Sequence, residues 1–173
     1  MQKFKTLADA IALAEFAHRN QIDKAGLSYI DHPKRVLAKV QAQGALPFVQ
    51  IAAILHDVTE DTAFSPQMLE WLGFSEAAIR LVKLLDRDYS KEVFESAEAW
   101  AKVDGKPLGM TADEFYYTNI RNDANAKMIK LADIGDNTEE WRLAYLELET
   151  ANRLRDKYAA AKNFLWGGKY VHP

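Results

Sequence analysis

The chain has 173 residues, of which 49% are hydrophobic and none is cysteine, and its formal net charge is −3. These totals fit one globular domain and exclude disulfides, thiolate metal sites and a strongly basic nucleic-acid-binding surface. The sequence has no run of about 18 apolar residues and no signal-peptide segment at its start. We therefore expect a cytoplasmic protein with neither a membrane nor a nucleic-acid partner.

The first part of the chain predicts two helices. The helical spacing of apolar residues indicates one helix over about 6–20 and another over about 33–43, joined by a loop around Gly26. Pro33 suits the first position of the second helix, and a residue before proline favours extended geometry. His32 is therefore expected at the mouth of that helix, where it is a plausible ligand.

The third predicted helix begins at Leu46–Pro47 and is apolar until four ionisable residues interrupt it: His56, Asp57, Glu60 and Asp61. His56 and Asp57 lie roughly 100° apart around the axis, so both can lean toward one point beside the helix. A neutral imidazole and a carboxylate suit a divalent metal ion. Glu60 and Asp61 follow one turn later, where a base for water would act. Because such a pair also arises by chance, the prediction depends on finding further ligands.

The rest of the chain predicts more helices and no strand, so the expected fold is an all-α single domain. The helices are expected over about 66–73, 75–86, 111–121, 125–137 and 138–165, with a short amphipathic helix inside 87–110. For 87–110 a surface excursion is favoured over a lid. The apolar stripe of the last helix is interpreted as packing, with a homodimer surface as an alternative.

Two further histidines and one acid bear on the site. Asp133 falls in the middle of an apolar helix and shares a face with Asn137, and a buried aspartate needs a cation or a basic partner. His18 continues the apolar stripe of the first helix, so a hydrogen-bonded core histidine is favoured over a ligand. His172, in the terminal tail, is interpreted as incidental.

Taken in order, the candidate ligands are His32, then His56-Asp57, then Asp133. This order resembles the HD superfamily of metal-dependent phosphohydrolases. Three segments resemble the hydrolase domain of RelA/SpoT proteins: Ala17-His18 with Gln21, Lys24, Gly26 and Tyr29-Ile30-Asp31-His32-Pro33; Ala53 to Asp57 with Glu60-Asp61-Thr62; and Lys130-Leu131-Ala132-Asp133 with Asn137. The resemblance covers about 6–141 of a single domain spanning 1–173, whose last helix and tail occupy 138–173. The length is similar to that of the small alarmone hydrolases, such as the metazoan SpoT homologues.

The resemblance implies hydrolysis of (p)ppGpp, with removal of the 3′-pyrophosphate by a metal-activated water. It implies one Mn²⁺, with Zn²⁺ or Fe²⁺ as alternatives, held by His32, His56, Asp57 and Asp133. Glu60 and Asp61 would activate and orient the water. The expected substrate contacts are Lys24, Tyr29 and Asn137, with Arg19, Lys130 and Arg121 as weaker candidates.

The sequence departs from the family at two places. Asp23 occupies a position where the family has a basic residue that packs against guanine, and Ile134-Gly135-Asp136 replaces a basic-Leu-His run. An acid at the first position would lose cation–π stacking on the base. Two alternatives therefore stay open: hydrolysis of another nucleotide, such as NADPH at its 2′-phosphate or a nucleoside phosphate, and a non-catalytic nucleotide-binding regulator.

Overall fold

The computed structural model describes residues 4–169, and within them the fold is all-α. Its eleven helices are α1 (Leu7–Ala17), α2 (Asp31–Ala42), α3 (Pro47–Leu55), α4 (Val58–Asp61), α5 (Pro66–Trp71), α6 (Glu76–Leu85), α7 (Arg87–Val103), α8 (Ala112–Arg121), α9 (Ala124–Asn137), α10 (Glu140–Leu143) and α11 (Leu148–Leu165). Among the described residues, none of the helices combines the length and the apolar character that a membrane span requires. His172 lies outside the described residues.

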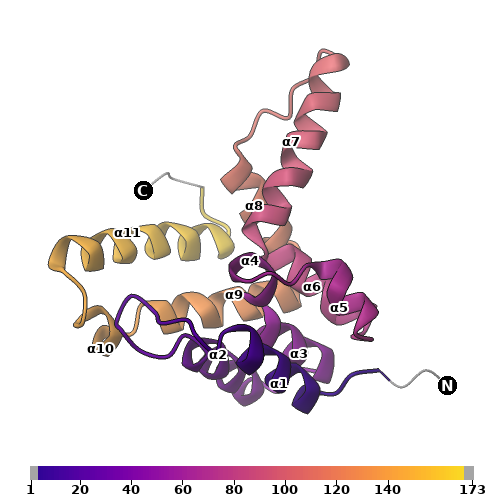
Figure 1. Ribbon diagram of the computed structural model, residues 1–173. Coiled ribbons are helices and arrows are strands. Elements are labelled where there is room, and N and C mark those ends of the chain that lie inside the picture. The colour runs from indigo at the N-terminus through magenta and orange to yellow at the C-terminus, as the bar shows by residue number, and fades with distance from the viewer. Residues whose placement is uncertain (1–3, 170–173) are drawn as a thin grey trace.

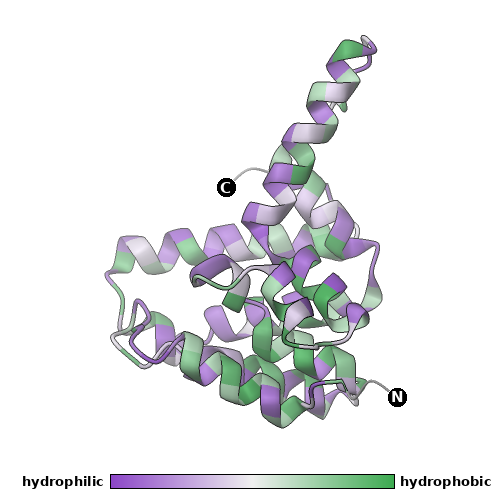
Figure 2. Ribbon diagram, turned by 45° about the vertical axis from the view of Figure 1, so that its right-hand side comes forward, coloured by the Kyte–Doolittle hydropathy of each residue, from purple (hydrophilic) through white to green (hydrophobic). Residues whose placement is uncertain are grey.

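The core is built around α3, which packs against α1, α2 and α6, while α9 packs against α2, α6 and α8 (Figure 1). All residues from Ile51 to Leu55 are buried. A helix that is apolar on every side belongs in the interior, and green apolar segments gather in this bundle in Figure 2. Because α3 is central, the polar residues that follow it are carried into the middle of the molecule.

Several helix starts are confirmed together with the residues that fix them. The helices expected from about 66 and 111 begin where Ser65 caps α5 ahead of Pro66 and where Thr111 forms a capping box with Glu114. Each of these side chains satisfies a backbone N–H that would otherwise lack a partner at the helix start.

Two predicted boundaries near the site were wrong. His32 is not extended before Pro33, because α2 already begins at Asp31 and His32 lies in its first turn. A proline is tolerated there, since the N–H groups of the first turn have no helical partner to lose. The third helix does not run unbroken through the ionisable residues between His56 and Asp61. It ends at Leu55, and His56 and Asp57 form a turn before the short α4.

The segment after Asp86 was predicted to hold only a short helix, and this was wrong as well. The 17-residue helix α7 rises from the body as an arm and the chain returns along it to α8 (Figure 1). Trp100 and Val103 near its end are 76% and 78% exposed. Few apolar residues of the arm reach the core, so its periodicity was hard to recognise.

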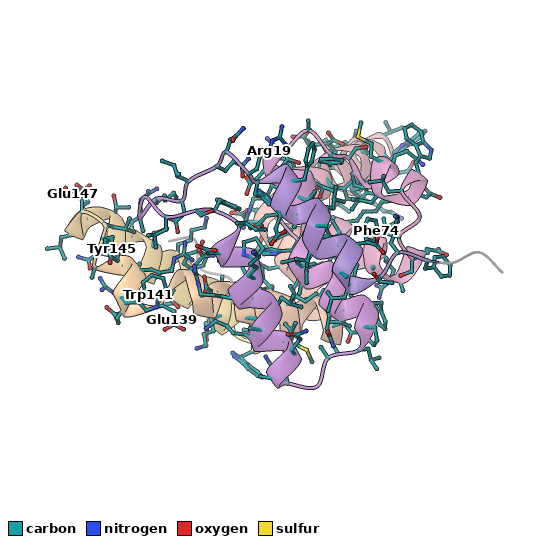
Figure 3. All side chains as sticks on the ribbon, turned by 60° about the horizontal axis from the view of Figure 1, so that its bottom comes forward. Arg19, Phe74, Glu139, Trp141, Tyr145 and Glu147 are labelled. Atoms are coloured by element: carbon teal, nitrogen blue, oxygen red, sulfur yellow. The ribbon has the colours of Figure 1, made fainter. Side chains whose placement is uncertain are left out.

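The long final helix predicted from Thr138 is in fact two helices. Trp141, Tyr145 and Leu148 are 45%, 66% and 73% exposed, so they do not continue the buried stripe, and Trp141 and Tyr145 point outward in Figure 3. The chain turns between α10 and α11, although no proline or glycine marks the break. As a result α11 folds back beside α9, with Leu154 and Ala161 buried.

Candidate active site

Four predicted ligands from three separate segments converge in the structure. His32 comes from α2, His56 and Asp57 from the turn after α3, and Asp133 from α9. Ligand atoms of His32, His56 and Asp57 all lie within 4.8 Å of one another. The Oδ1 atom of Asp133 lies 3.2 Å from Nε2 of His32 and 4.0 Å from Nε2 of His56. Side chains separated by about a hundred residues in sequence therefore surround one point.

In both imidazoles, a hydrogen bond at Nδ1 holds the ring so that Nε2 is directed at that point. Nδ1 of His56 lies 2.8 Å from the carbonyl oxygen of Ala53, and Nδ1 of His32 lies 2.7 Å from Oδ2 of Asp136. A hydrogen bond at Nδ1 fixes the tautomer and leaves the Nε2 lone pair for a ligand. Nε2 of His56 is buried and has no hydrogen-bond partner. Two imidazoles and two carboxylates in this arrangement fit a divalent cation.

The charges around the cluster favour ionised carboxylates. Burial alone would raise the pKa of Asp133, but Lys130, 2.7 Å away, together with His32 holds it well below the usual range. For His32, burial alone would lower the pKa, yet the hydrogen bonds with Asp133 and Asp136 outweigh it and raise the pKa to about 9. The carboxylates of this network therefore attract positive charge to the point where the four side chains meet, whether it is a proton on His32 or a cation.

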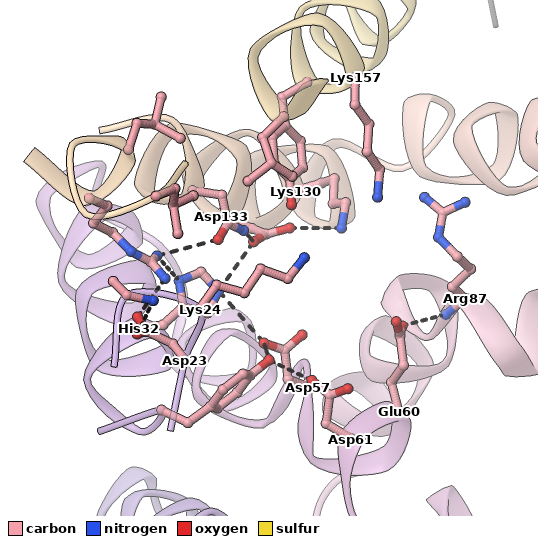
Figure 4. A pocket seen from close by; sticks show the side chains of 18 of the residues that line it. Asp23, Lys24, His32, Asp57, Glu60, Asp61, Arg87, Lys130, Asp133 and Lys157 are labelled. Carbon is pink, nitrogen blue, oxygen red and sulfur yellow. Dashed lines mark hydrogen bonds and ion pairs between the residues drawn. The ribbon is translucent and has the colours of Figure 1, made fainter. Parts of the chain in front are cut away.

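Glu60 and Asp61 flank the cluster from α4, as Figure 4 shows. Oε2 of Glu60 accepts a hydrogen bond of 2.8 Å from the backbone N–H of Arg87, at the start of α7. Asp61 is within hydrogen-bond distance of the Tyr29 hydroxyl, which also lies 2.9 Å from Oδ2 of Asp57. Burial is the main reason that the pKa of both carboxyl groups is raised. Both are thus oriented acids with enhanced basicity beside the His/Asp cluster.

A cavity of about 410 Å³ opens over the cluster. Its cationic lining comes from five different segments of the fold: Lys24, Arg87, Lys130, Arg142 and Lys157. Lys130 is paired with Asp133, and Arg87 with Asp113 and the Tyr117 hydroxyl. Burial and the neighbouring cations, above all Arg87, lower the pKa of Lys157. Several cationic side chains beside the His/Asp cluster suit a substrate with several phosphate groups.

The sequence did not single out Arg87 and Lys157 as site residues. Arg87 starts α7 directly after the capping residue Asp86, so its guanidinium emerges beside Tyr116 and Tyr117. Lys157 reaches the cavity only because α11 folds back over α9. No local spacing distinguishes either residue from an ordinary solvated base.

The predicted substrate contacts divide into two groups. The cavity lining includes Lys24, Tyr29, Lys130 and Asn137. Arg19 does not line it, because its guanidinium lies over the Phe16 ring and donates to the Phe16 carbonyl oxygen. Arg121 is likewise absent from the lining and lies over the ring of Phe164.

His18 is confirmed as a buried, hydrogen-bonded residue. Its Nδ1 lies 2.6 Å from Oε1 of Gln21, and its ring stacks on Tyr29 at 4.8 Å between centroids. Since Tyr29 contacts both Asp57 and Asp61, the stacked His18 ring helps to hold Tyr29 in its position beside the site.

The two departures from the RelA/SpoT pattern lie close together in the fold. Asp23 accepts hydrogen bonds from the N–H groups of Ala25 and Leu27, and forms a 2.8 Å ion pair with Arg142. Asp136, fully buried, contacts His32, Arg35 and the same Arg142. Neither the pairing nor the part played by Arg142 was anticipated from the sequence.

Known proteins resemble this chain in sequence over part of its length and in fold over nearly all of it. No protein-family model matches. "Probable GTP pyrophosphokinase" of Mycobacterium leprae (strain TN) is 26% identical over 128 residues, which are 72% of this chain and 14% of that protein. The chain therefore matches only a small part of that relative's length.

A solved structure, described as "A metazoan ortholog of SpoT hydrolyzes ppGpp and plays a role in starvation responses", has a TM-score of 0.69 at 22% sequence identity. The match covers 98% of this chain and 90% of that one. The chain therefore shares the fold of that protein, and its His32, His56 and Asp57 are close enough together to hold a metal ion.

Proposed function

We propose that the protein is a divalent-metal-dependent hydrolase that removes the 3′-pyrophosphate from (p)ppGpp. The observation that carries the proposal is the meeting of His32, His56, Asp57 and Asp133 at the floor of a cavity lined by cations. The fold of a protein described as hydrolysing ppGpp supports it. We propose Mn²⁺ as the ion, with Zn²⁺ and Fe²⁺ as alternatives of similar ligand preference.

In this proposal each group of side chains has a separate task. A divalent cation held by the four ligands would polarise a phosphoryl oxygen and make water a stronger nucleophile. Glu60 accepts the proton of the attacking water, and Asp61, oriented by Tyr29, holds that water in line. Lys24 and Lys157 bind the phosphate groups. Water adds to phosphorus, the 3′-oxygen leaves with a proton, and ppGpp yields GDP and pyrophosphate.

The test is direct incubation of the purified, Mn²⁺-loaded protein with ppGpp, followed by separation of the nucleotides. We expect equal amounts of GDP and pyrophosphate. If metal analysis shows full loading and ppGpp stays intact, the proposal is wrong. An exposed variant such as Asp104→Ala serves as a purification control, because Asp104 lies near the end of the arm.

A second candidate is hydrolysis of another phosphorylated nucleotide, such as NADPH at its 2′-phosphate. It is favoured by the placement of Asp23, whose carboxylate is engaged by Arg142 and two backbone N–H groups. That position therefore offers no cation to stack on guanine. A panel of nucleotides at equal concentration separates the two: a strong preference for a non-guanine compound selects the second candidate.

A nucleotide-binding regulator without catalysis is the remaining alternative. It requires tight binding without turnover, and it requires that Asp61→Ala leave the biological role unchanged. The presence of both acids beside the four ligands favours the hydrolase.

A further inference from the structure

Asp136 is fully buried and surrounded by donors. Its carboxylate lies 2.7 Å from Nδ1 of His32, receives two hydrogen bonds from Arg35 at 2.8 and 3.0 Å, and receives a third from Nη1 of Arg142 at 2.6 Å. A carboxylate that accepts the Nδ1 proton of an imidazole fixes the ring and raises its basicity at Nε2. Asp136 therefore determines how His32 presents its metal-binding nitrogen.

Arg142 connects this carboxylate with a second acid on a different segment. Its Nη1 contacts Asp136 and lies 3.3 Å from Oδ1 of Asn137, while its Nη2 donates to Oδ2 of Asp23 at 2.8 Å. The side chain is 11% exposed, and Arg142 lines the cavity. A planar guanidinium can hold two carboxylates at fixed geometry, which a lysine cannot do.

Asp23 stabilises the loop at residues 21–30. Besides pairing with Arg142, it accepts from the N–H groups of Ala25 and Leu27, so it fixes the turn that carries Lys24. The same loop ends with Tyr29, whose hydroxyl contacts Asp57 and Asp61. The loop thus places Lys24 and Tyr29, among other residues, in the lining of the cavity. Within the described interactions, Arg142 is the side chain that connects the loop to α10.

The charges of the network are balanced. Two guanidinium groups, Arg35 and Arg142, face two carboxylates, Asp23 and Asp136. If Arg142 lost its charge, Asp23, with a side chain only 5% exposed, would lose its ion-pair partner. Breaking a buried pair from one side is strongly unfavourable, because the remaining charge lacks compensation.

We propose that Arg142 is a positioning residue that couples the loop at residues 21–30 to the Asp136–His32 pair. One side chain then determines both the position of the loop residues that line the cavity and the orientation of the proposed metal ligand His32. The coupling to metal binding rests on the proposed function, whereas the coupling to the loop does not. Both acids in the network stand where the sequence departs from the RelA/SpoT pattern, so this connection is a feature of this chain.

The experiment compares Arg142→Gln with Arg142→Lys, Asp23→Asn and the matched control Arg155→Gln. Arg155 also pairs with an acid of α10, Glu140, but does so on the surface and away from the cavity. Two quantities are measured on each protein: amide hydrogen exchange of residues 21–30 and Mn²⁺ affinity by calorimetric titration of the metal-free protein. With substrate, KM and kcat are determined separately.

For Arg142→Gln we expect faster exchange in the loop, and Mn²⁺ affinity about 10-fold to 100-fold lower, the usual effect of removing an outer-shell partner. Arg142→Lys should restore the fold and the charge without restoring either property fully. Asp23→Asn should loosen the loop and raise KM, with a smaller effect on Mn²⁺ affinity.

Loop exchange and Mn²⁺ affinity equal to those of Arg155→Gln in both Arg142 variants would overturn the inference. If Arg142→Gln fails to fold, Arg142→Lys and Asp23→Asn decide the matter by the same two measurements. A wild-type protein that binds no Mn²⁺ would instead contradict the proposed function, and the exchange of the loop would still test the coupling.

Discussion

The two ends of the cavity are built on different principles. At the end with the His/Asp cluster, His32 and Asp133 have partners within hydrogen-bond distance, and the polar groups hold one another in place. At the other end, Lys24 and Lys157 line the cavity and, among the described residues, neither forms an ion pair with a carboxylate. The first end is organised before a ligand arrives, whereas the second leaves positive charge for the ligand to neutralise.

This difference means that the two ends of the cavity should contribute to different steps, one to metal binding and the other to substrate binding. Ligands for a cation must be oriented in advance, because the ion accepts only a narrow coordination geometry. Phosphate groups tolerate more variable partners, and lysines act on them as point charges on flexible stems. Substitutions at the first end should therefore change metal content and rate, and substitutions at the second end should change substrate affinity.

The largest effect is expected for Asp57→Ala. Its carboxylate belongs to the compact group with His32 and His56, so its loss should abolish both bound Mn²⁺ and hydrolysis. Metal content by elemental analysis and product formation on the same sample check this. A variant that keeps a full equivalent of metal would show that the ligand set is different.

Glu60→Gln should separate the chemistry from metal binding. Gln keeps an oxygen to accept the Arg87 N–H bond, but it cannot take a proton. We expect metal content to be unchanged and kcat to fall by about 10²-fold or more, the usual scale for a lost general base. The exposed Glu92→Gln on α7 is the control, and equal kcat values for the two variants would exclude Glu60 as the base.

Lys157→Met tests the cationic end. We expect KM to rise about tenfold with kcat little changed, since a charge-assisted hydrogen bond contributes about 1.5–3 kcal/mol. Lys162→Met, on an exposed position of the same helix, should match the wild type. Steady-state kinetics decide the case, and a loss confined to kcat would place Lys157 in the chemical step instead.

The smallest effect is a shift of the pH profile. Burial, only partly offset by the Arg87 N–H bond, raises the pKa of Glu60, and a general base acts only when ionised. Activity should therefore fall as pH drops through this raised pKa, at higher pH than for an ordinary glutamate. In Glu60→Gln, measured at saturating metal, the decrease of kcat at low pH that is due to protonation of Glu60 should disappear. If the decrease of kcat at low pH is unchanged in this variant, it belongs to another titrating group, and Asp61, whose pKa burial also raises, is the first candidate.

The central helices could be predicted from the sequence because the patterns that indicate them lie within short segments of the chain. The apolar run before His56 indicated a buried helix, and the helix α3 is indeed central. The helix starts expected near 66 and 111 are also confirmed, and the structure has Ser65 and Thr111 as their capping residues. The break between α10 and α11 was missed, because apolar spacing continues through it and no glycine or proline interrupts the chain.

By itself, the sequence determined the all-α fold class and supplied the side chains proposed as metal ligands, since residue type and helical spacing limit which chemistry a segment can carry. Only the tertiary structure decided what stands beside them: Arg87 and Lys157 in the cavity, and Arg142 between Asp23 and Asp136. Periodicity reports which face of one helix a residue occupies. It contains no information about a partner 119 residues away, as Asp23 is from Arg142, because that contact is set by how whole helices pack.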